Sequence, residues 1–161
     1  IEMICGKRVL DYLNMVNDQN HQISVKLSAK MDKTAQAVER LQEENFRLKG
    51  QVGQMVDDMC QKEAERYAGS GSVLIFMDGM DADSVRRLAD AVTQTCQGCC
   101  AVFSRNADGS FKYAMGEKDG DLRQFTKEMN AKLNGRGGGK PFFVQGSVQA
   151  TEEEIRRFFE Q

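Results

Sequence analysis

The sequence has little of what marks a membrane protein or a hydrolase. It contains no tryptophan, one proline and a single histidine, His21. No apolar run approaches the roughly 18 residues of a membrane span, and no secretory signal is visible. With one histidine in a polar, helical stretch, no pairing of a nucleophile with a base stands out. We therefore expect a non-catalytic, cytoplasmic chain with no membrane contact.

An excess of positive charge is also absent. The chain has 22 Lys and Arg against 24 Asp and Glu. A dedicated nucleic-acid binder usually carries a basic excess, because neutralising phosphates supplies most of its affinity. Any contact with RNA must therefore come from a local basic patch.

The five cysteines are odd in number and irregularly spaced, as is typical of reduced thiols in the cytosol. Cys96 and Cys99 have the spacing at which two thiolates can share a tetrahedral ion. No further ligand accompanies them, however. Cys99 and Cys100 also begin a predicted strand, so one of them should point into the core. We predict no metal site and no cofactor in this chain.

Residues 7–68 have the pattern of a helical arm. From residue 27 to residue 59, mainly apolar residues recur at alternating steps of four and three, which is a heptad seam. The members of this heptad seam are Leu27, Met31, Thr34, Val38, Leu41, Asn45, Leu48, Val52, Met55 and Met59. An apolar seam on a lone helix is not stable in water and must pack on another helix. We name Leu41, Asn45, Leu48 and Val52 as candidate dimerisation residues.

The sequence does not decide which helix packs on the heptad seam. Residues 7–27 also have a helical pattern, and Ser28 and Asp32 are candidate N-caps for a second helix. A hairpin turning near residues 28–32 is our preferred interpretation. One continuous helix that dimerises with a second copy is the alternative, because no Gly or Pro enforces a break. Asn45 either fixes register and partner number from a buried position or is solvated at a frayed seam.

After residue 72 the pattern changes to that of a small mixed α+β domain. The expected order is β-α-β-β-α-β-α, with a glycine-rich loop before the last strand. The strands are expected at residues 73–77, 99–104, 110–115 and 142–144. The helices are expected after Asp81 or Asp83, from Asp121, and from Thr151, where Thr151 and Glu154 form a capping-box pattern. The fold class is thus a long helical hairpin or coiled-coil arm followed by a mixed sheet with helices packed on it.

The glycine-rich run Gly135–Lys140 is the strongest local signal. Consecutive glycines between Arg136 and Lys140 leave the backbone free to converge on an anion. From residue 121 to residue 140 there are five basic and two acidic side chains, a local charge of +3. A plain flexible loop is the competing interpretation, and Pro141 after the lysine excludes a Walker A motif. We name Lys132, Arg136, Gly137, Gly138, Gly139, Lys140 and Gln145 as candidate nucleic-acid-binding residues.

The order of these segments resembles the C-terminal half of alanyl-tRNA synthetases and freestanding alanyl-tRNA editing proteins. Residues 1–6 (IEMICG) look like the R-I-E-x-x-x-G strand that closes their editing domain, without its leading Arg. Residues 7–68 are similar to their helical linker, which is commonly a hairpin or coiled coil. Residues 72–161 resemble their DHH-associated domain, whose G-G-x-G-G motif is matched by Gly135, Gly137, Gly138 and Gly139.

The resemblance implies a function for an intact parent protein. The family hydrolyses Ser- or Gly-tRNA(Ala) at a zinc-bearing editing site, with zinc ligands that belong upstream of residue 1. The family assigns the C-terminal tail to contact with the tRNA body and to dimerisation, so tRNA, with tRNA(Ala) favoured, and a second copy are the expected partners. A purely structural dimerisation module is the alternative. Whether the parent is a synthetase or a freestanding editor stays open.

One departure from the wider superfamily bears on chemistry. Its phosphoesterase members place a histidine after the glycines to contact substrate phosphate, whereas this sequence has Lys140 and Pro141 there. The resemblance therefore favours binding of an RNA backbone over an independent phosphoesterase activity.

Overall fold

The structure, a computed structural model, describes residues 6–160. The chain divides into two compact units, residues 1–53 and residues 54–161, with the boundary inside one long helix. The strand expected at residues 1–6 lies outside the described residues except for Gly6. That residue precedes the first helix and has a φ of 64°.

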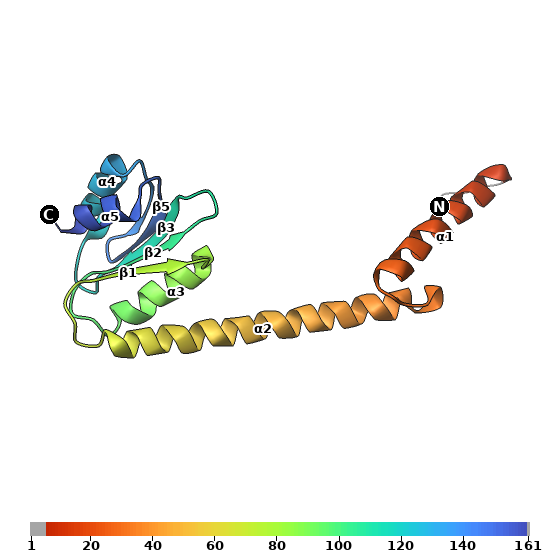
Figure 1. The fold of residues 1–161 in the computed structure, drawn as a ribbon, viewed down its shortest axis with the longest axis horizontal. Helices are drawn as coiled ribbons and strands as arrows, with labels where there is room; N and C mark the ends of the chain where they lie inside the picture. The colour runs from red at the N-terminus through yellow and green to blue at the C-terminus, as the bar shows by residue number, and fades with distance from the viewer. Residues whose placement is uncertain (1–5, 161) are drawn as a thin grey trace. The chain divides into compact units, whose positions relative to one another are not determined.

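The first unit contains two helices separated by a tight turn (Figure 1). Helix α1 (Lys7–Lys26) is followed by the 3₁₀ turn η1 (Met31–Lys33) and by α2 (Thr34–Arg66), which continues into the second unit. Ser28 ends α1 in the left-handed conformation, with a φ of 48°. The backbone N–H of Ala29 donates to Ser24 O (2.9 Å), and that of Ser28 donates to Val25 O (3.2 Å). These two bonds form a Schellman motif, so the alternative of one continuous helix is wrong.

The turn is held by side chains other than the expected caps. Asn20 Nδ2 donates to Met31 O (2.9 Å), and Thr34 Oγ1 donates to Asn20 Oδ1 (2.7 Å). Ser28 instead terminates α1, and Asp32 lies within η1. Beyond the turn, the apolar side chains of both helices are exposed, Leu10 and Leu13 on α1 among them. Among the described residues of this unit, α1 therefore does not cover the heptad seam as a closed hairpin would.

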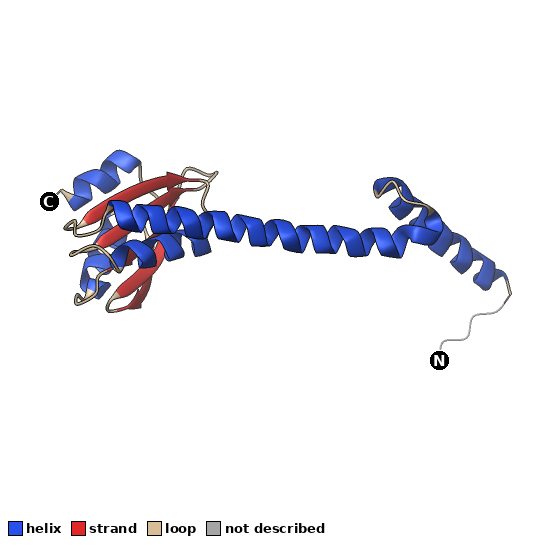
Figure 2. Ribbon diagram, turned by 90° about the horizontal axis from the view of Figure 1, so that it is seen from below, coloured by secondary structure: helices blue, strands red, loops and turns tan. Residues whose placement is uncertain are grey.

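The second unit is a five-stranded mixed sheet with helices on both faces (Figure 2). Its strands are β1 (Val73–Asp78), β2 (Cys100–Arg105), β3 (Phe111–Gly116), β4 (Arg136–Lys140) and β5 (Phe143–Val148). Its helices are α3 (Ala82–Thr93), α4 (Leu122–Lys132) and α5 (Glu152–Phe159). The strand order is β1-β2-β3-β5-β4, with β1 parallel to β2 and every other pair antiparallel.

Two apolar clusters hold the sheet between its helices. On one face, Val102 and Ala114 of the sheet pack with Leu88 and Val92 of α3 and with Cys60 at the end of α2. On the other face, strand residues pack with α4 and α5, where Met129 and Ile155 are fully buried. Alternate residues of β1, β2, β3 and β5 serve the two clusters, as strand geometry requires, whereas β4 contributes to neither. Cys100 enters the first cluster, which confirms that one of the paired cysteines points into the core.

The glycine-rich run was expected to be a loop, and this expectation is wrong. Residues 136–140 form β4, which pairs antiparallel with β5 at the edge of the sheet. Gly137 pairs with Gly146, and a Cβ on Gly137 would lie 2.6 Å from both Gly146 Cα and Tyr113 Oη. The glycines Gly137 and Gly146 therefore permit a close approach of two backbones beside the hydroxyl of Tyr113. They carry no side chains that could alternate, so the pattern of a strand is not visible in the sequence.

Two of the predicted helix starts are confirmed by their hydrogen bonds. Asp81 caps α3, accepting from Ser84 N at 2.7 Å. Thr151 caps α5 in a full capping box, in which Thr151 Oγ1 accepts from Glu154 N and the Glu154 carboxylate accepts from Thr151 N. Both caps satisfy N–H groups that the first turn of a helix leaves without partners.

Candidate nucleic-acid interface

The edge strand β4 presents different groups on its two faces. All five of its residues are exposed. Because successive residues of a strand point to opposite faces, Arg136 and Lys140 share one face. Gln145 lies on that face too, since it pairs with Gly138 on the neighbouring strand. Gly137 and Gly139 turn to the opposite face, on which α4 packs. The structure thus brings Arg136, Lys140 and Gln145 together on one side of the β4–β5 ribbon.

A groove of about 420 Å³ lies between α4 and β4. We call it the α4–β4 groove. It is lined by Asp121, Arg123, Gln124, Thr126, Lys127, Gly137, Gly138 and Gly139. Arg123 and Lys127 are four residues apart, so they share one face of α4. Neither is among the candidate binding residues named from the sequence, although this spacing of two cations on a predicted helix identifies them.

Helix α4 is fastened to β4 by a chain of hydrogen bonds. The buried Tyr113 donates from Oη to Asn130 Oδ1 (3.0 Å), and Asn130 Nδ2 donates to Gly137 O (3.4 Å). Desolvation raises the pKa of Tyr113, so its hydroxyl remains a donor at neutral pH. The helix ends at Lys132, and the φ of 49° at Asn134, just beyond the helix end, allows Gly135 N to donate back to Asn130 O (2.7 Å). The groove therefore has a fixed wall on each side.

An ion pair sets the charge at one end of the groove. Arg123 donates to both oxygens of Asp121, from Nε at 2.9 Å and from Nη2 at 2.6 Å. The side-chain and backbone hydrogen bonds from Arg123 lower the pKa of Asp121 to about 2. Asp121 is consequently ionised at neutral pH and offsets the charge of Arg123. Lys127 adds a second cation one helical turn further along α4.

Comparison with known proteins places the sheet unit in a family. The family model of the DHHA1 domain matches residues 70–161. This chain belongs to the DHHA1 family. The expected resemblance is thereby confirmed, and the DHHA1 residues include all of β4 and the α4–β4 groove.

The similar curated proteins are alanine–tRNA ligases. The ligase of Thiobacillus denitrificans is 26% identical over 156 residues, which cover 88% of this chain and 18% of the ligase. That of Clostridioides difficile is 25% identical over 162 residues, covering 92% of this chain and 18% of the ligase. The chain thus spans less than a fifth of the length of these relatives.

Among solved structures, the chain is similar to the C-Ala domain of Aquifex aeolicus alanyl-tRNA synthetase. The two are 20% identical, with a TM-score of 0.49, and the likeness covers 58% of this chain and 92% of that one.

Of the predicted residues, only Gly137, Gly138 and Gly139 line the α4–β4 groove, and Lys132 and the candidate dimerisation residues lie neither in it nor on the β4–β5 ribbon. The exposed Lys132 is in the last turn of α4, with Nζ 5.3 Å from the ring centroid of Phe158 on α5. The candidate dimerisation residues Leu41, Asn45, Leu48 and Val52 are all on α2 in the first unit, and all four side chains are exposed.

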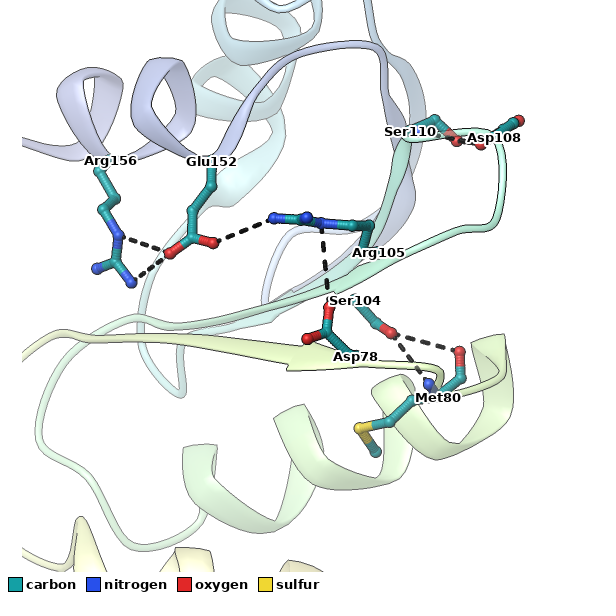
Figure 3. Close-up of polar contacts among 8 residues, drawn as sticks. All are labelled: Asp78, Met80, Ser104, Arg105, Asp108, Ser110, Glu152 and Arg156. Carbon is teal, nitrogen blue, oxygen red and sulfur yellow. Dashed lines mark hydrogen bonds and ion pairs between the residues drawn. The ribbon is translucent and has the colours of Figure 1, made fainter.

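A second polar cluster of the DHHA1 domain lies where β1 and β2 end (Figure 3). Arg105 is 3.5 Å from Glu152 and 4.0 Å from Asp78, and Glu152 also pairs with Arg156 at 2.7 Å. The buried Ser104 accepts from Met80 N at 3.1 Å. The carboxylates of Asp78 and Glu152 each have an arginine partner, and these contacts join α5 to the two strands, whereas Asp108 accepts from Ser110. The cluster is therefore explained as an ion-pair network that supports the fold.

The zinc that the family resemblance implies finds no ligand set in the described part of the chain. Within residues 6–160, no three His, Cys, Asp or Glu side chains are grouped so that they could hold a metal ion. Burial and the nearby Glu117 and Cys96 raise the pKa of Cys99 to about 12, so this thiol is protonated at neutral pH.

None of the helices within residues 6–160 has the length and apolar character that a membrane span needs.

Proposed function

We propose that the DHHA1 domain is a tRNA-binding module of a larger protein that handles alanyl-tRNA. The observation that carries this proposal is the exposed strand β4, which has cations on either side. Arg136 and Lys140 lie on one face of the strand, and Arg123 and Lys127 line the α4–β4 groove on the other. The similarity to alanine–tRNA ligases supports tRNA as the ligand.

The chemistry of β4 suits an RNA backbone better than a base. Lys and Arg on a rigid strand can neutralise phosphates, and glycines allow the phosphate backbone to approach the main chain closely. Such contacts fix orientation but carry no sequence information. Because the whole chain has a net charge of −2, the affinity for tRNA should be moderate. Because the contacts are between cations and phosphates, the affinity should fall as the salt concentration rises. The module would hold the tRNA body while another part of the parent acts on the aminoacyl end.

A pair of charge-matched variants tests this proposal. In the double variant R136A/K140A, tRNA(Ala) binding should weaken. The slope of the logarithm of the binding constant against the logarithm of the salt concentration should become shallower by about 2, because two phosphate contacts are lost. The control R86A/K118A removes the same charge from α3 and from the segment after β3, away from β4. A filter-binding titration at several salt concentrations measures both. Equal affinities for the wild type and R136A/K140A would refute the proposal.

We also propose that the parent removes wrongly attached amino acids from tRNA(Ala), with zinc held outside this chain. The support is the family membership together with the lack of a metal-ligand group in residues 6–160. We accordingly assign no catalytic step to any residue of this chain. The 161-residue chain supplied with zinc should leave Ser-tRNA(Ala) intact in an acid-gel deacylation assay, and rapid deacylation would contradict this assignment.

A second function is favoured by the exposed helical arm. We propose that the arm binds a second copy of the chain, because Leu41, Leu48 and Val52 lie along one side of α2 without cover from α1. Side chains of this kind, aligned on one helix, gain stability by packing on another helix. Sedimentation equilibrium at tens of micromolar should find a dimer, and a monomer at that concentration would reject this role.

A further inference from the structure

A second cavity of the DHHA1 domain lies between the start of α4, the end of α5 and the first residues of β1. We call it the α4–α5 pocket. Its volume is about 510 Å³, within the range of cavities that hold small molecules. We infer that this pocket binds a small organic cation, in which an amidinium or ammonium group is joined to a flat apolar body.

Three phenylalanines form an apolar wall of the pocket. The ring centroid of Phe125 on α4 lies 5.3 Å from that of Phe158 and 5.4 Å from that of Phe159, both on α5. The rings of Phe158 and Phe159 are 5.7 Å apart, and their planes are inclined by 80°. All three side chains are only half-buried. A flat apolar group gains by covering such rings, and a cation gains by lying over the face of one.

The charged residues of the pocket favour a positive ligand. Three of the lining residues are acidic: Glu117, Asp121 and Glu160. One is basic, Arg156, and its guanidinium is already bound to Glu152 Oε1, from Nη2 at 2.7 Å and from Nε at 2.9 Å. Within residues 6–160, the carboxylates of Glu117 and Glu160 have no ion pair and no hydrogen bond. The charge left for a ligand is therefore negative.

The helix ends beside the pocket do not favour an anion. Asp121 accepts from Arg123 N at 3.1 Å, and Leu122 N donates to Pro141 O at 2.7 Å. These two N–H groups at the start of α4 are therefore satisfied within the chain. Helix α5 ends at Phe159, and the C-terminal end of a helix carries partial negative charge. A phosphate would thus find little at α4, whereas a cation gains at the end of α5.

Glu117 and Asp121 are placed to bind the charged group together. They flank the segment that joins β3 to α4. A Cβ on Gly120 would collide with the carboxylate of Glu117, so the glycine lets this carboxylate lie beside the residue that precedes Asp121. A planar amidinium presents several N–H donors in fixed directions, as a guanidinium does, and can donate to both carboxylates.

Asp121 also connects the α4–α5 pocket with the α4–β4 groove, because it lines both. This connection rests on the proposed function of the groove. Asp121 is now paired with Arg123, which lines the groove, and the two side chains are 52% and 59% exposed, so the ion pair is easily exchanged. A cation that takes the Asp121 carboxylate releases Arg123 to a phosphate in the groove. Binding of the cation and of RNA should therefore strengthen each other.

A series of ligands with one shape tests the preference for positive charge. Benzamidine is a cation, benzamide is neutral and benzoate is an anion, and all three have the same ring. In an NMR titration of the full chain at constant ionic strength, benzamidine should bind with a millimolar dissociation constant and benzamide about tenfold more weakly. Benzoate should not saturate, and neither should methylammonium, a cation without the ring. The amide shifts that change should lie in residues 117–125 and 156–160.

Nearly isosteric variants test the two carboxylates. E117Q/D121N should raise the dissociation constant of benzamidine about tenfold and leave that of benzamide unchanged. Asparagine at residue 121 is still a good N-cap, so α4 should keep its start. The control D119N/E128Q removes the same charge from exposed residues outside the pocket and should have no effect. Circular dichroism should show the wild-type helix content in both variants.

A titration with tRNA(Ala) tests the connection through Asp121. Saturating benzamidine should lower the dissociation constant of tRNA by about two- to fivefold for the wild type, relative to methylammonium at the same concentration. D121N releases Arg123 permanently, so this variant should bind tRNA more tightly than the wild type without benzamidine. Adding benzamidine to D121N should then change nothing.

The outcomes separate the pocket from the proposed function. A wild type that binds no tRNA would refute the proposed function, while the ligand series would still decide the pocket. The cation site would be overturned if benzamidine did not saturate, if benzamide bound as tightly, or if the shifts lay elsewhere. Equal losses in E117Q/D121N and D119N/E128Q would overturn it too. Saturable benzamidine binding that leaves tRNA affinity unchanged would refute the connection through Asp121.

Discussion

At the scale of single residues, the neighbouring glycines Gly137 and Gly138 of β4 differ in the space around them. A Cβ on Gly137 would lie 2.6 Å from Tyr113 Oη and from Gly146 Cα, whereas a Cβ on Gly138 would have no atom within 4 Å. Gly137 is thus required by packing beside the hydroxyl of Tyr113. Gly138 is open on that test, so packing does not require a glycine there.

The first prediction compares these two positions. Gly137→Ala should lower the free energy of unfolding by about 1–3 kcal/mol, because the added methyl group forces β4 away from β5 or displaces Tyr113. Gly138→Ala should change it by less than about 0.5 kcal/mol. Urea unfolding monitored by circular dichroism measures both. Equal effects at the two positions would show that the β4–β5 pairing is not as close as described.

The second prediction concerns two buried threonines with different partners. Thr126 Oγ1 has no hydrogen-bond partner among the described residues, whereas Thr93 Oγ1 donates to Ala89 O at 2.6 Å. Thr126→Val should therefore raise the free energy of unfolding by about 1 kcal/mol, and Thr93→Val should lower it by about 1 kcal/mol. Opposite signs in the same urea experiment are expected. A loss of stability in Thr126→Val equal to that in Thr93→Val would contradict the assignment.

At the scale of elements, local patterns predicted the helices better than the strands. The starts of α3 and α5 were predicted because their N-caps, Asp81 and Thr151, each need only a partner three residues later, which a sequence displays. The break after α1 was placed correctly, but its cause is the left-handed Ser28 and the bonds of Asn20, both of which depend on contacts across the turn.

Strand β4 and the α4–β4 groove depend on contacts that the sequence does not display. Glycines give no alternation, and the pairing of Gly137 with Gly146 follows from a turn of only two residues, Pro141 and Phe142, between the strands. The basic residues between positions 121 and 140 were recognised in the sequence. That Arg136 and Lys140 lie on the face of β4 away from α4 follows only from this pairing. Lys132 belongs to the same basic run, four residues before Arg136, but it lies beside α5 and outside the groove.

The third prediction concerns helix α2. Gly50 and Gly53 are both in its interior, and an added methyl group would meet no atom within 4 Å at either. Gly50→Ala and Gly53→Ala should each stabilise the helix by about 1 kcal/mol. The expected result is higher helical ellipticity at 222 nm and slower amide exchange in α2. Unchanged exchange in both variants would mean that the glycines are not the weak point of the helix.

At the scale of the whole molecule, the proposed functions rest on two of the surfaces that the described residues leave exposed. The heptad seam of α2 suits a second copy of the chain, and the β4 edge suits an RNA backbone. They are the surfaces on which the proposed binding of tRNA and of a second copy rests, and the chain spans less than a fifth of the length of the related ligases.

The most direct test of the central claim is hydrogen exchange of the full chain with and without tRNA(Ala). Binding through β4 predicts slower exchange at Gly137, Gly138 and Gly139 and in the first turns of α4, with α3 on the opposite face unchanged. Protection of α3, or no change at the three glycines under saturating tRNA, would contradict the account.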